Sequence, residues 1–490
     1  MADIAKKDNI ATTSLWYDSV KPKWDMVDTL LKGTPGMRAA RDRYTPKHDK
    51  EEDSTYDLRL EITFLLEAYL DAIDRAVALP FSVPLKVDGL PPELEYLVDN
   101  VDNLGTSMNS YAELLLNKSI NYGMDFLFAD YPQTKNSNGA IITNAKQERD
   151  LGINPRILRI DAPDMLFIRV SYNLGVPTLT EVRFREWRTE PCGTYGEQSV
   201  EYIRVVGVDY FELWKKIVKE GTVTDEWEKA DEGAHDFGSI PIIPFYTNKK
   251  GFFRATPPLE KLAQKNVEHW QKDSQKNIEL YYASGVWYET GAEVDKNGTP
   301  LTPLVVGPGI YRATSSPEGA LTHVAPDPAA LEKLFEDLAN IVREMKEFGA
   351  APFQDNSVAI TATAEAGSIT RQTSDIKAWT TDEEDALEMI IRFCARWKKI
   401  EHKIGKDLNV NIHHDYQPLI YGSTDLDHVE FAINNGMITK EQGNLEFQRR
   451  SVLSENMDAK KQVTLAAKEM ADSIELIPIR DPAEDVVEDE

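Results

Sequence analysis

The stretch Thr256-Pro-Pro-Leu-Glu-Lys-Leu-Ala-Gln-Lys-Asn-Val-Glu-His-Trp-Gln-Lys-Asp-Ser274 divides a strand-rich part of the sequence from a helical one. Thr256 is a favourable N-cap and proline is well tolerated in a first turn, so the stretch predicts a helix that continues to about Ala283. Asp327-Pro328 predicts the start of a second helix over residues 329–348. Between the two helices, short apolar runs separated by turn residues predict a small insert with strands.

The region before this stretch carries a different pattern. Apolar residues between Asp57 and Leu79 recur at helical spacing and predict one amphipathic helix, and a second helical pattern covers residues 92–120. Residues 123–248 then hold short runs rich in Ile, Val, Phe and Tyr, which predict an antiparallel sheet of five to seven strands. The runs are residues 157–160, 165–172, 181–187, 201–208 and 240–247, while residues 210–218 fit either a helix or a strand.

The region after the second helix returns to helical signals. Residues 349–367 hold Ala, Thr, Pro and Gly with few large side chains, and Ser368 begins a long helical pattern that reaches Ile404. A predicted strand at residues 409–413 is followed by three further helical patterns, which begin at Ser423, Thr439 and Asn456. The last ten residues, 481–490, include six acidic ones and predict a disordered tail. The fold class is therefore α+β.

Composition limits the classes of function. The chain has 490 residues, long enough for two to four structural units, and its 55 Lys plus Arg against 82 Asp plus Glu give a net charge of −27. Such an acidic chain argues against a broad surface that neutralises phosphates, so any nucleic acid is expected to be held loosely. The sequence shows no signal peptide and no apolar run of membrane-spanning length, which predicts a subunit made in the cytoplasm with no membrane partner.

Motifs for catalysis are missing. The sequence has no phosphate-binding Gly-x-x-x-x-Gly-Lys-Ser/Thr, no Gly-x-Ser-x-Gly and no cysteine pair at metal-ligand spacing. The only histidine cluster is His413-His414-Asp415, and adjacent strand residues point to opposite faces, so a structural or solvated role is expected. The carboxylates of residues 382–385 spread round a helix and predict a solvated face. We therefore expect no catalytic residue, no cofactor and no metal, and no enzyme.

One line of basic residues invites a functional interpretation. Lys261, Lys265, Lys272 and Lys276 fall within about 60° of one another on the predicted helix and form a line about 22 Å long. Glutamates 268 and 279 lie on the same side, which favours pairing of the lysines with acidic residues along or between helices. The other interpretation is a sparse positive line that faces DNA in a channel and binds it weakly.

The order of these elements resembles that of portal proteins of tailed bacteriophages, in particular a podophage and prophage portal family. The stretch from Thr256 to Ser274 resembles that family, and further motifs resemble it in the same order. They are Trp24-Asp-Met-Val-Asp28, Gly36-Met-Arg-Ala-Ala40, Tyr44-Thr-Pro46, Val305-Val-Gly-Pro-Gly-Ile-Tyr-Arg312, Thr361-Ala-Thr-Ala-Glu-Ala366 and Asn435-Gly-Met-Ile-Thr-Lys-Glu441. The resemblance spans nearly the whole chain.

The resemblance implies a portal fold with named parts. These are a wing of N-terminal helices and β-sheet at 1–255, stem helices at 256–283 and 329–348, an α/β clip at 284–328, a tunnel loop at 349–367, a long helix and wing return at 368–422, a helical crown at 423–480 and the acidic tail at 481–490. The implied tunnel-loop residues are Gly349, Gln354, Asn356, Thr361, Thr363 and Gly367.

The resemblance also implies a function and partners. Portal subunits form a ring, usually a dodecamer, at one capsid vertex of the virion, after assembly in the host cytoplasm. The ring passes double-stranded DNA non-specifically during packaging and ejection, and the tail attaches to it. The implied partners are further copies of the chain, the terminase large subunit, an adaptor or head-completion protein, and the major capsid or scaffolding protein. Two alternatives stay open: a metal-dependent hydrolase or nuclease that uses His413 and His414, and a minor capsid or scaffold protein without a channel.

Overall fold

The computed structural model describes most of the chain and divides it into two units, Met1–Tyr416 and Gln417–Glu490. The described residues are 9–132, 153–219, 222–283, 287–290, 296, 319–323, 328–348, 362–405, 407–414, 416, 423–449, 453 and 459–475. The elements confirm the α+β class. Each unit is considered by itself.

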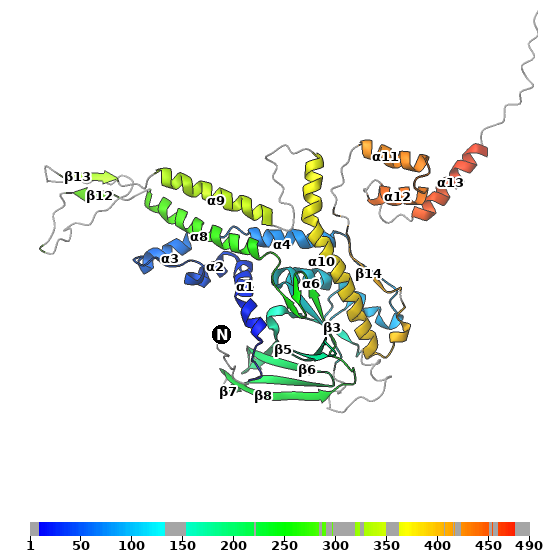
Figure 1. Cartoon of the computed structure of the whole chain (residues 1–490), viewed down its shortest axis with the longest axis horizontal. Coiled ribbons are helices and arrows are strands. Elements are labelled where there is room, and N and C mark those ends of the chain that lie inside the picture. The colour runs from blue at the N-terminus through cyan, green and yellow to red at the C-terminus, as the bar shows by residue number, and fades with distance from the viewer. Residues whose placement is uncertain are drawn as a thin grey trace, which may run out of the picture. The chain divides into compact units, whose positions relative to one another are not determined.

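The N-terminal part of the first unit is helical (Figure 1). Its helices are α1 (Leu15–Leu31), α2 (Gly33–Ala40), α3 (Asp53–Glu61), α4 (Ala68–Ala78), α5 (Tyr96–Asp99) and α6 (Met108–Tyr122). Ser14 and Ser107 cap α1 and α6, because each hydroxyl accepts a hydrogen bond from a backbone N–H in the first turn. Gly123 ends α6 with a φ of +88°, and a Cβ there would lie 2.2 Å from the carbonyl oxygen of Thr256, so only glycine fits.

The expected single helix over residues 57–79 is wrong, since α3 and α4 are separated by residues 62–67. Backbone groups of this connection are satisfied by side chains from other elements instead of by helical bonds. Asn277 and Asn266 donate to the carbonyls of Ile62 and Leu66, and Thr34 accepts from the N–H of Leu65. The pattern over residues 92–120 is likewise divided, into a short 3₁₀ turn, α5 and α6.

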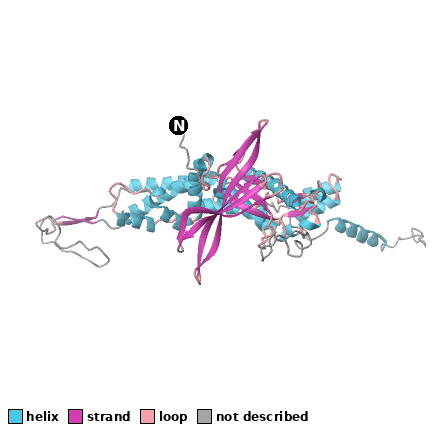
Figure 2. Cartoon of the chain, turned by 90° about the horizontal axis from the view of Figure 1, so that it is seen from below, coloured by secondary structure: helices cyan, strands magenta, loops and turns pink. Residues whose placement is uncertain are grey.

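The strands form two principal sheets, both antiparallel. The smaller has the order β3-β2-β9 and the larger β4-β5-β6-β7-β8. Their bounds are β2 (Met124–Asp130), β3 (Arg156–Asp161), β9 (Ile242–Tyr246), β4 (Met165–Asn173), β5 (Val176–Cys192), β6 (Gly196–Gly207), β7 (Tyr210–Lys219) and β8 (Thr222–Ala234). The expected single sheet is thus two sheets, residues 210–218 are a strand, and the long strands of the larger sheet extend past the layer of helices (Figure 2).

Two long helices follow the sheets: α8 (Glu260–Ala283) and α9 (Pro328–Phe348). Between them in the sequence, β12 (Trp287–Thr290) pairs with β13 (Ala320–His323), as expected for a strand-bearing insert, while residues 304–312 of the insert lie outside the described residues. Thr256 is not the N-cap of α8, since the helix begins at Glu260. Its hydroxyl instead accepts from the side chain of Asn248, beside the hairpin of β10 (Lys249–Gly251) and β11 (Arg254–Ala255).

Helix α10 (Ala362–Trp397) starts earlier and ends earlier than the sequence predicts. Residues 362–367 of the expected tunnel loop are therefore helical, and Thr363 and Gly367 belong to α10. Gly349, Gln354, Asn356 and Thr361 lie outside the described residues. The helix ends before Lys399, whose φ of +58° is incompatible with continuing it. Beyond it, β14 (Asn409–Asn411) pairs with β1 (Lys86–Asp88).

Two apolar clusters form the core of the first unit. The larger joins the N-terminal helices to α8, α9 and α10, and includes Ile73, Leu262, Ile341 and Leu387. The smaller lies where α1 meets the two sheets, with Trp24 as its largest buried side chain.

The short 3₁₀ helices are Arg41–Arg43, Pro80–Ser82, Pro92–Leu94, Ala162–Asp164 and Glu401–Lys403.

In the second unit, the described residues form the helices α11 (Ser423–Asn434), α12 (Lys440–Arg449) and α13 (Ala459–Glu475). All three were expected from the sequence. Helix α12 packs against both α11 and α13. The acidic residues 481–490 lie outside the described residues.

Candidate functional site on helix α8

Helices α8 and α9 form an antiparallel pair held by ion pairs. The Nζ of Lys265 lies 2.7 Å from a carboxylate oxygen of Glu344, and that of Lys272 lies 3.0 Å from one of Asp337. The second contact lies about two turns closer to the C-terminus of α8 and about two turns closer to the N-terminus of α9, so the two helices run antiparallel. Lys261 continues the register, with its Nζ 5.9 Å from the ring centre of Phe348.

Lys261, Lys265 and Lys272 thus lie along the seam between the two helices. Lys265 also contacts Glu268 at 2.8 Å, and Lys276 pairs with Asp273 on α8 itself. Hydrogen bonds to Glu268 and Glu344 raise the pKa of Lys265. Because these groups are exposed to solvent, each pair contributes little to stability. Three of the four lysines thus pair with acidic residues, which was one of the two interpretations of the sequence. The other interpretation, a role facing DNA, stays a prediction.

The solvent-facing stripe of α8 lies beside the lysines and has a different composition. It carries Gln264, Glu268, Gln271, Gln275 and Glu279, which recur at helical spacing. The three glutamines are exposed, and Glu268 keeps 42% of its side chain exposed. In a single subunit, the side of α8 that meets solvent carries these neutral and acidic residues together with the exposed Lys261, so it is not uniformly basic.

A third side of α8 is polar but buried. It carries Asn266, Trp270, Ser274 and Asn277, and their side chains bond to residues 45–69. Asn266 donates to Leu66 O at 2.8 Å and accepts from Tyr69 N–H at 2.9 Å, Trp270 Nε1 donates to Thr45 Oγ1 at 2.6 Å, Ser274 Oγ accepts from Arg59 at 3.1 Å, and Asn277 donates to Ile62 O at 3.3 Å. Sequence reasoning missed this face, and it fastens α8 to the N-terminal helices.

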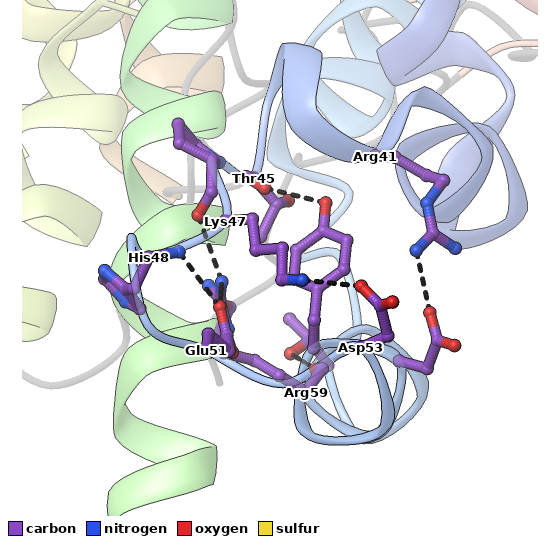
Figure 3. Close-up of polar contacts among 12 residues, drawn as sticks. Arg41, Thr45, Lys47, His48, Glu51, Asp53 and Arg59 are labelled. Atoms are coloured by element: carbon purple, nitrogen blue, oxygen red, sulfur yellow. Dashed lines mark hydrogen bonds and ion pairs between the residues drawn. The ribbon is translucent and has the colours of Figure 1, made fainter.

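Arg59 lies at the centre of the polar contacts between these segments (Figure 3). Its guanidinium makes two parallel bonds to the carboxylate of Glu51, at 2.8 and 2.7 Å, and a third to Pro46 O at 3.0 Å. The two side chains are only 4% and 6% exposed. The N–H of His48 donates to Glu51 at 3.1 Å, so this buried carboxylate has several donors.

These donors make the network sensitive to acid. Burial acts to raise the pKa of Glu51, but the hydrogen bonds from Arg59 and His48 outweigh it and hold the pKa below its ordinary value. A lowered carboxylate pKa gives stability that is complete above the unfolded pKa of about 4.3 and is lost as the pH falls through the folded value.

We therefore expect the free energy of unfolding of the full chain to fall between about pH 5 and pH 3, and to fall less steeply in Glu51→Gln. Urea unfolding at several pH values measures the slope. The exposed neighbour Glu52→Gln is the matched control and should keep the wild-type slope. Equal slopes for Glu51→Gln and the wild type would contradict the assignment of the acid response to Glu51.

The histidine cluster is placed by contacts to α10. His414 Nε2 lies 3.0 Å from Glu384 Oε1, and its Nδ1 lies 3.0 Å from the hydroxyl of Thr380, so both ring nitrogens are engaged. His413 contacts the ring of Tyr416 edge to face. These contacts fasten the residues after β14 to α10. Across the described residues, no group of three or more His, Cys, Asp and Glu side chains could hold a metal ion.

The expected solvated face at residues 382–385 is wrong for one residue. Asp382 and Asp385 are exposed, but Glu383 is fully buried against the core. Burial raises the pKa of Glu383 well above its usual range, so its carboxyl group is neutral. Neither of its oxygens has a hydrogen-bond partner among the described atoms.

Comparisons with known proteins give a match to one family model and matches to solved structures. The family described as "Domain of unknown function (DUF4055)" matches residues 258–398, which run from just before α8 to just after α10. No curated protein sequence matches the chain. No described helix is long and apolar enough to span a membrane.

Three solved structures share a distant likeness, each at 12% identity. The neck of a native GTA particle, computed with C12 symmetry, has a TM-score of 0.42 and covers 77% of this chain and 88% of its own. The neck of an empty GTA particle, computed with C6 symmetry, has a TM-score of 0.42 and covers 85% and 98%. The virion of a native gene transfer agent particle has a TM-score of 0.41 and covers 83% and 97%. Likenesses this distant carry no inference about the present chain.

Proposed function

We propose that the chain is one subunit of a ring-shaped portal, a head-to-tail connector through which double-stranded DNA enters and leaves a phage-like particle. The observation that carries the proposal is the succession of elements. Two antiparallel sheets are followed by helix α8, a strand pair, the antiparallel helix α9 and the long helix α10. In portal subunits the same order corresponds to wing, stem, clip, stem and long helix.

The sides of α8 suit such a channel wall. One side of α8 is buried against residues 45–69, and another side forms ion pairs with α9. The helix is therefore held in place on two sides. The remaining stripe consists mainly of glutamines and glutamates, with Lys261 as an exposed cation beside it, so it would bind phosphates only weakly. A ring of chains that each carry a net charge of −27 repels DNA weakly and lets it slide.

The role proposed here is passive. The chain moves no DNA by its own chemistry, and the energy for packaging comes from a terminase motor. The partners are further copies of the chain in a dodecamer, the terminase, an adaptor or head-completion protein, and the capsid or scaffolding protein. The place of action is one vertex of the virion. A chelator-sensitive cleavage of DNA that disappears in His414→Ala would contradict the passive role.

Assembly tests the proposal directly. We expect negative-stain images of the purified full chain, alone or with the capsid and scaffolding proteins of its particle, to show closed rings with a central hole. Native mass spectrometry of the same sample gives the number of copies. A chain that stays monomeric under all of these conditions would overturn the proposal, as would open filaments, because a portal must close.

A further inference from the structure

Among its described residues, the three-helix unit formed by α11, α12 and α13 buries few of its large apolar side chains. Val429 is the only large apolar residue that is buried among those of the unit that the structure describes. Four others, one or more on or beside each helix, are more than half exposed: Phe431 at 57%, Met437 at 69%, Leu445 at 52% and Leu465 at 53%. Exposed apolar side chains on so small a unit indicate a surface that a partner covers.

The charges of the unit indicate what that partner is. Helix α11 carries Asp425, Asp427 and Glu430 and no Lys or Arg, whereas residues 459–468 of α13 carry Lys460, Lys461 and Lys468 and no acidic residue. Helix α12 packs against both, so it connects an acidic helix to one whose first ten residues carry basic charge and whose remaining residues include Glu469, Asp472 and Glu475. The exposed Phe431 belongs to the acidic helix, and the exposed Leu465 to the basic half of α13.

Such a unit is complementary to a second copy of itself. A head-to-tail contact would place the basic half of α13 from one copy against α11 of the next, with the apolar side chains covered between them and opposite charges around them. Head-to-tail contacts use two different surfaces of each subunit, and they form a ring when the rotation between copies closes. A partner of uniform charge, such as DNA, would match only one of the two outer helices.

We infer that the unit of residues 417–490 acquires its core from neighbouring copies, through a heterologous contact between α13 of one copy and α11 of the next. The inference rests on the proposed ring and adds the surface by which its C-terminal units join. The contact forms only in the assembled state, so the three helices are poorly protected in the free subunit and well protected in the ring.

Charge reversal in the full chain tests the contact. One variant, Asp427→Lys with Glu430→Lys, makes α11 basic; the second, Lys461→Glu with Lys468→Glu, makes α13 acidic; the third combines all four changes. Each of the first two should lower the hydrogen-exchange protection of α11–α13 in rings by about tenfold, because like charges then face each other. The combined variant should regain most of the protection. Lys440→Glu on α12 is the control and should change little.

The outcomes separate this inference from the proposed function. Rings whose α11–α13 helices exchange as fast as in the free subunit would overturn the inference and leave the proposed function standing. Helices that are already protected in the free subunit would overturn it too, since the cover would then come from the same chain. If the hydrogen-exchange protection of the combined variant were no higher than that of either double variant, a pairing of α13 with α11 of the next copy would be excluded. Failure of the wild-type chain to form any ring is the separate result that counts against the portal.

Discussion

Asn266→Pro is expected to abolish ring assembly and to unfold helix α8. A proline inside a helix costs about 3 kcal/mol or more, because it removes a backbone donor and clashes with the preceding turn. The change also removes the buried amide that serves Leu66 O and Tyr69 N–H, and each buried group left unpaired costs about 1–3 kcal/mol. The sum approaches the whole stability of a typical domain, about 5–15 kcal/mol.

Two further variants distinguish the effect of breaking helix α8 from the effect of losing the hydrogen bonds of the Asn266 side chain. Asn266→Ala keeps α8 helical and loses only the two hydrogen bonds, so it should destabilise the chain by about 2–4 kcal/mol. Asn340→Ala, on the exposed side of α9, should be within about 0.5 kcal/mol of the wild type. Guanidinium unfolding followed by circular dichroism measures all three, and negative-stain imaging scores the rings. Intact rings of Asn266→Pro would rule out a stem role for α8.

Most of the fold could be predicted from apolar spacing, and the exceptions have physical causes. Strand β8 was not predicted from the sequence, because five of its thirteen residues are acidic, namely Asp225, Glu226, Glu228, Asp231 and Glu232. It lies at the edge of the larger sheet, where charged side chains face water and prevent pairing with other chains. Edge strands of this kind lack the alternation by which buried strands are recognised.

The break between α3 and α4 could not be predicted for a different reason. The residues around it have helical spacing, and what interrupts the helix is a set of side chains from α2 and α8. Asn266 is 200 positions away from Leu66 in the sequence. Local propensity therefore favoured a continuous helix, and tertiary hydrogen bonds prevailed over it.

The candidate site was predicted in part. Lys265 and Lys272 could be placed on one side of α8 from spacing alone, and pairing with acidic residues was one of the two interpretations. Their partners Glu344 and Asp337 could not be named, because the register of α8 against α9 depends on how the two helices pack. The buried polar side with Asn266 and Ser274 gave no distinctive signal, since both residues are usually exposed on helices.

Arg59→Met is expected to destabilise the full chain by about 3–5 kcal/mol, because it leaves the buried carboxylate of Glu51 without its partner. Replacing the unpaired carboxylate of Glu51 as well should recover much of the lost stability. Since a buried ion pair can often be replaced by apolar groups at little cost, the double variant Arg59→Met with Glu51→Leu should regain at least half of the lost stability. Denaturant unfolding of the four proteins in this cycle gives the coupling energy between the two residues.

The exposed pair of Arg41 and Asp57 provides a control for this cycle, because it joins the 3₁₀ helix Arg41–Arg43 to α3 on the surface. Its side chains are 52% and 60% exposed, so Arg41→Met should destabilise the chain far less than Arg59→Met. If Arg59→Met were no more harmful than Arg41→Met, the buried network would not be what fastens α8. If it is more harmful, hydrogen exchange should locate the loss in both α3 and α8, because Arg59 bonds Glu51 on one side and Ser274 of α8 on the other.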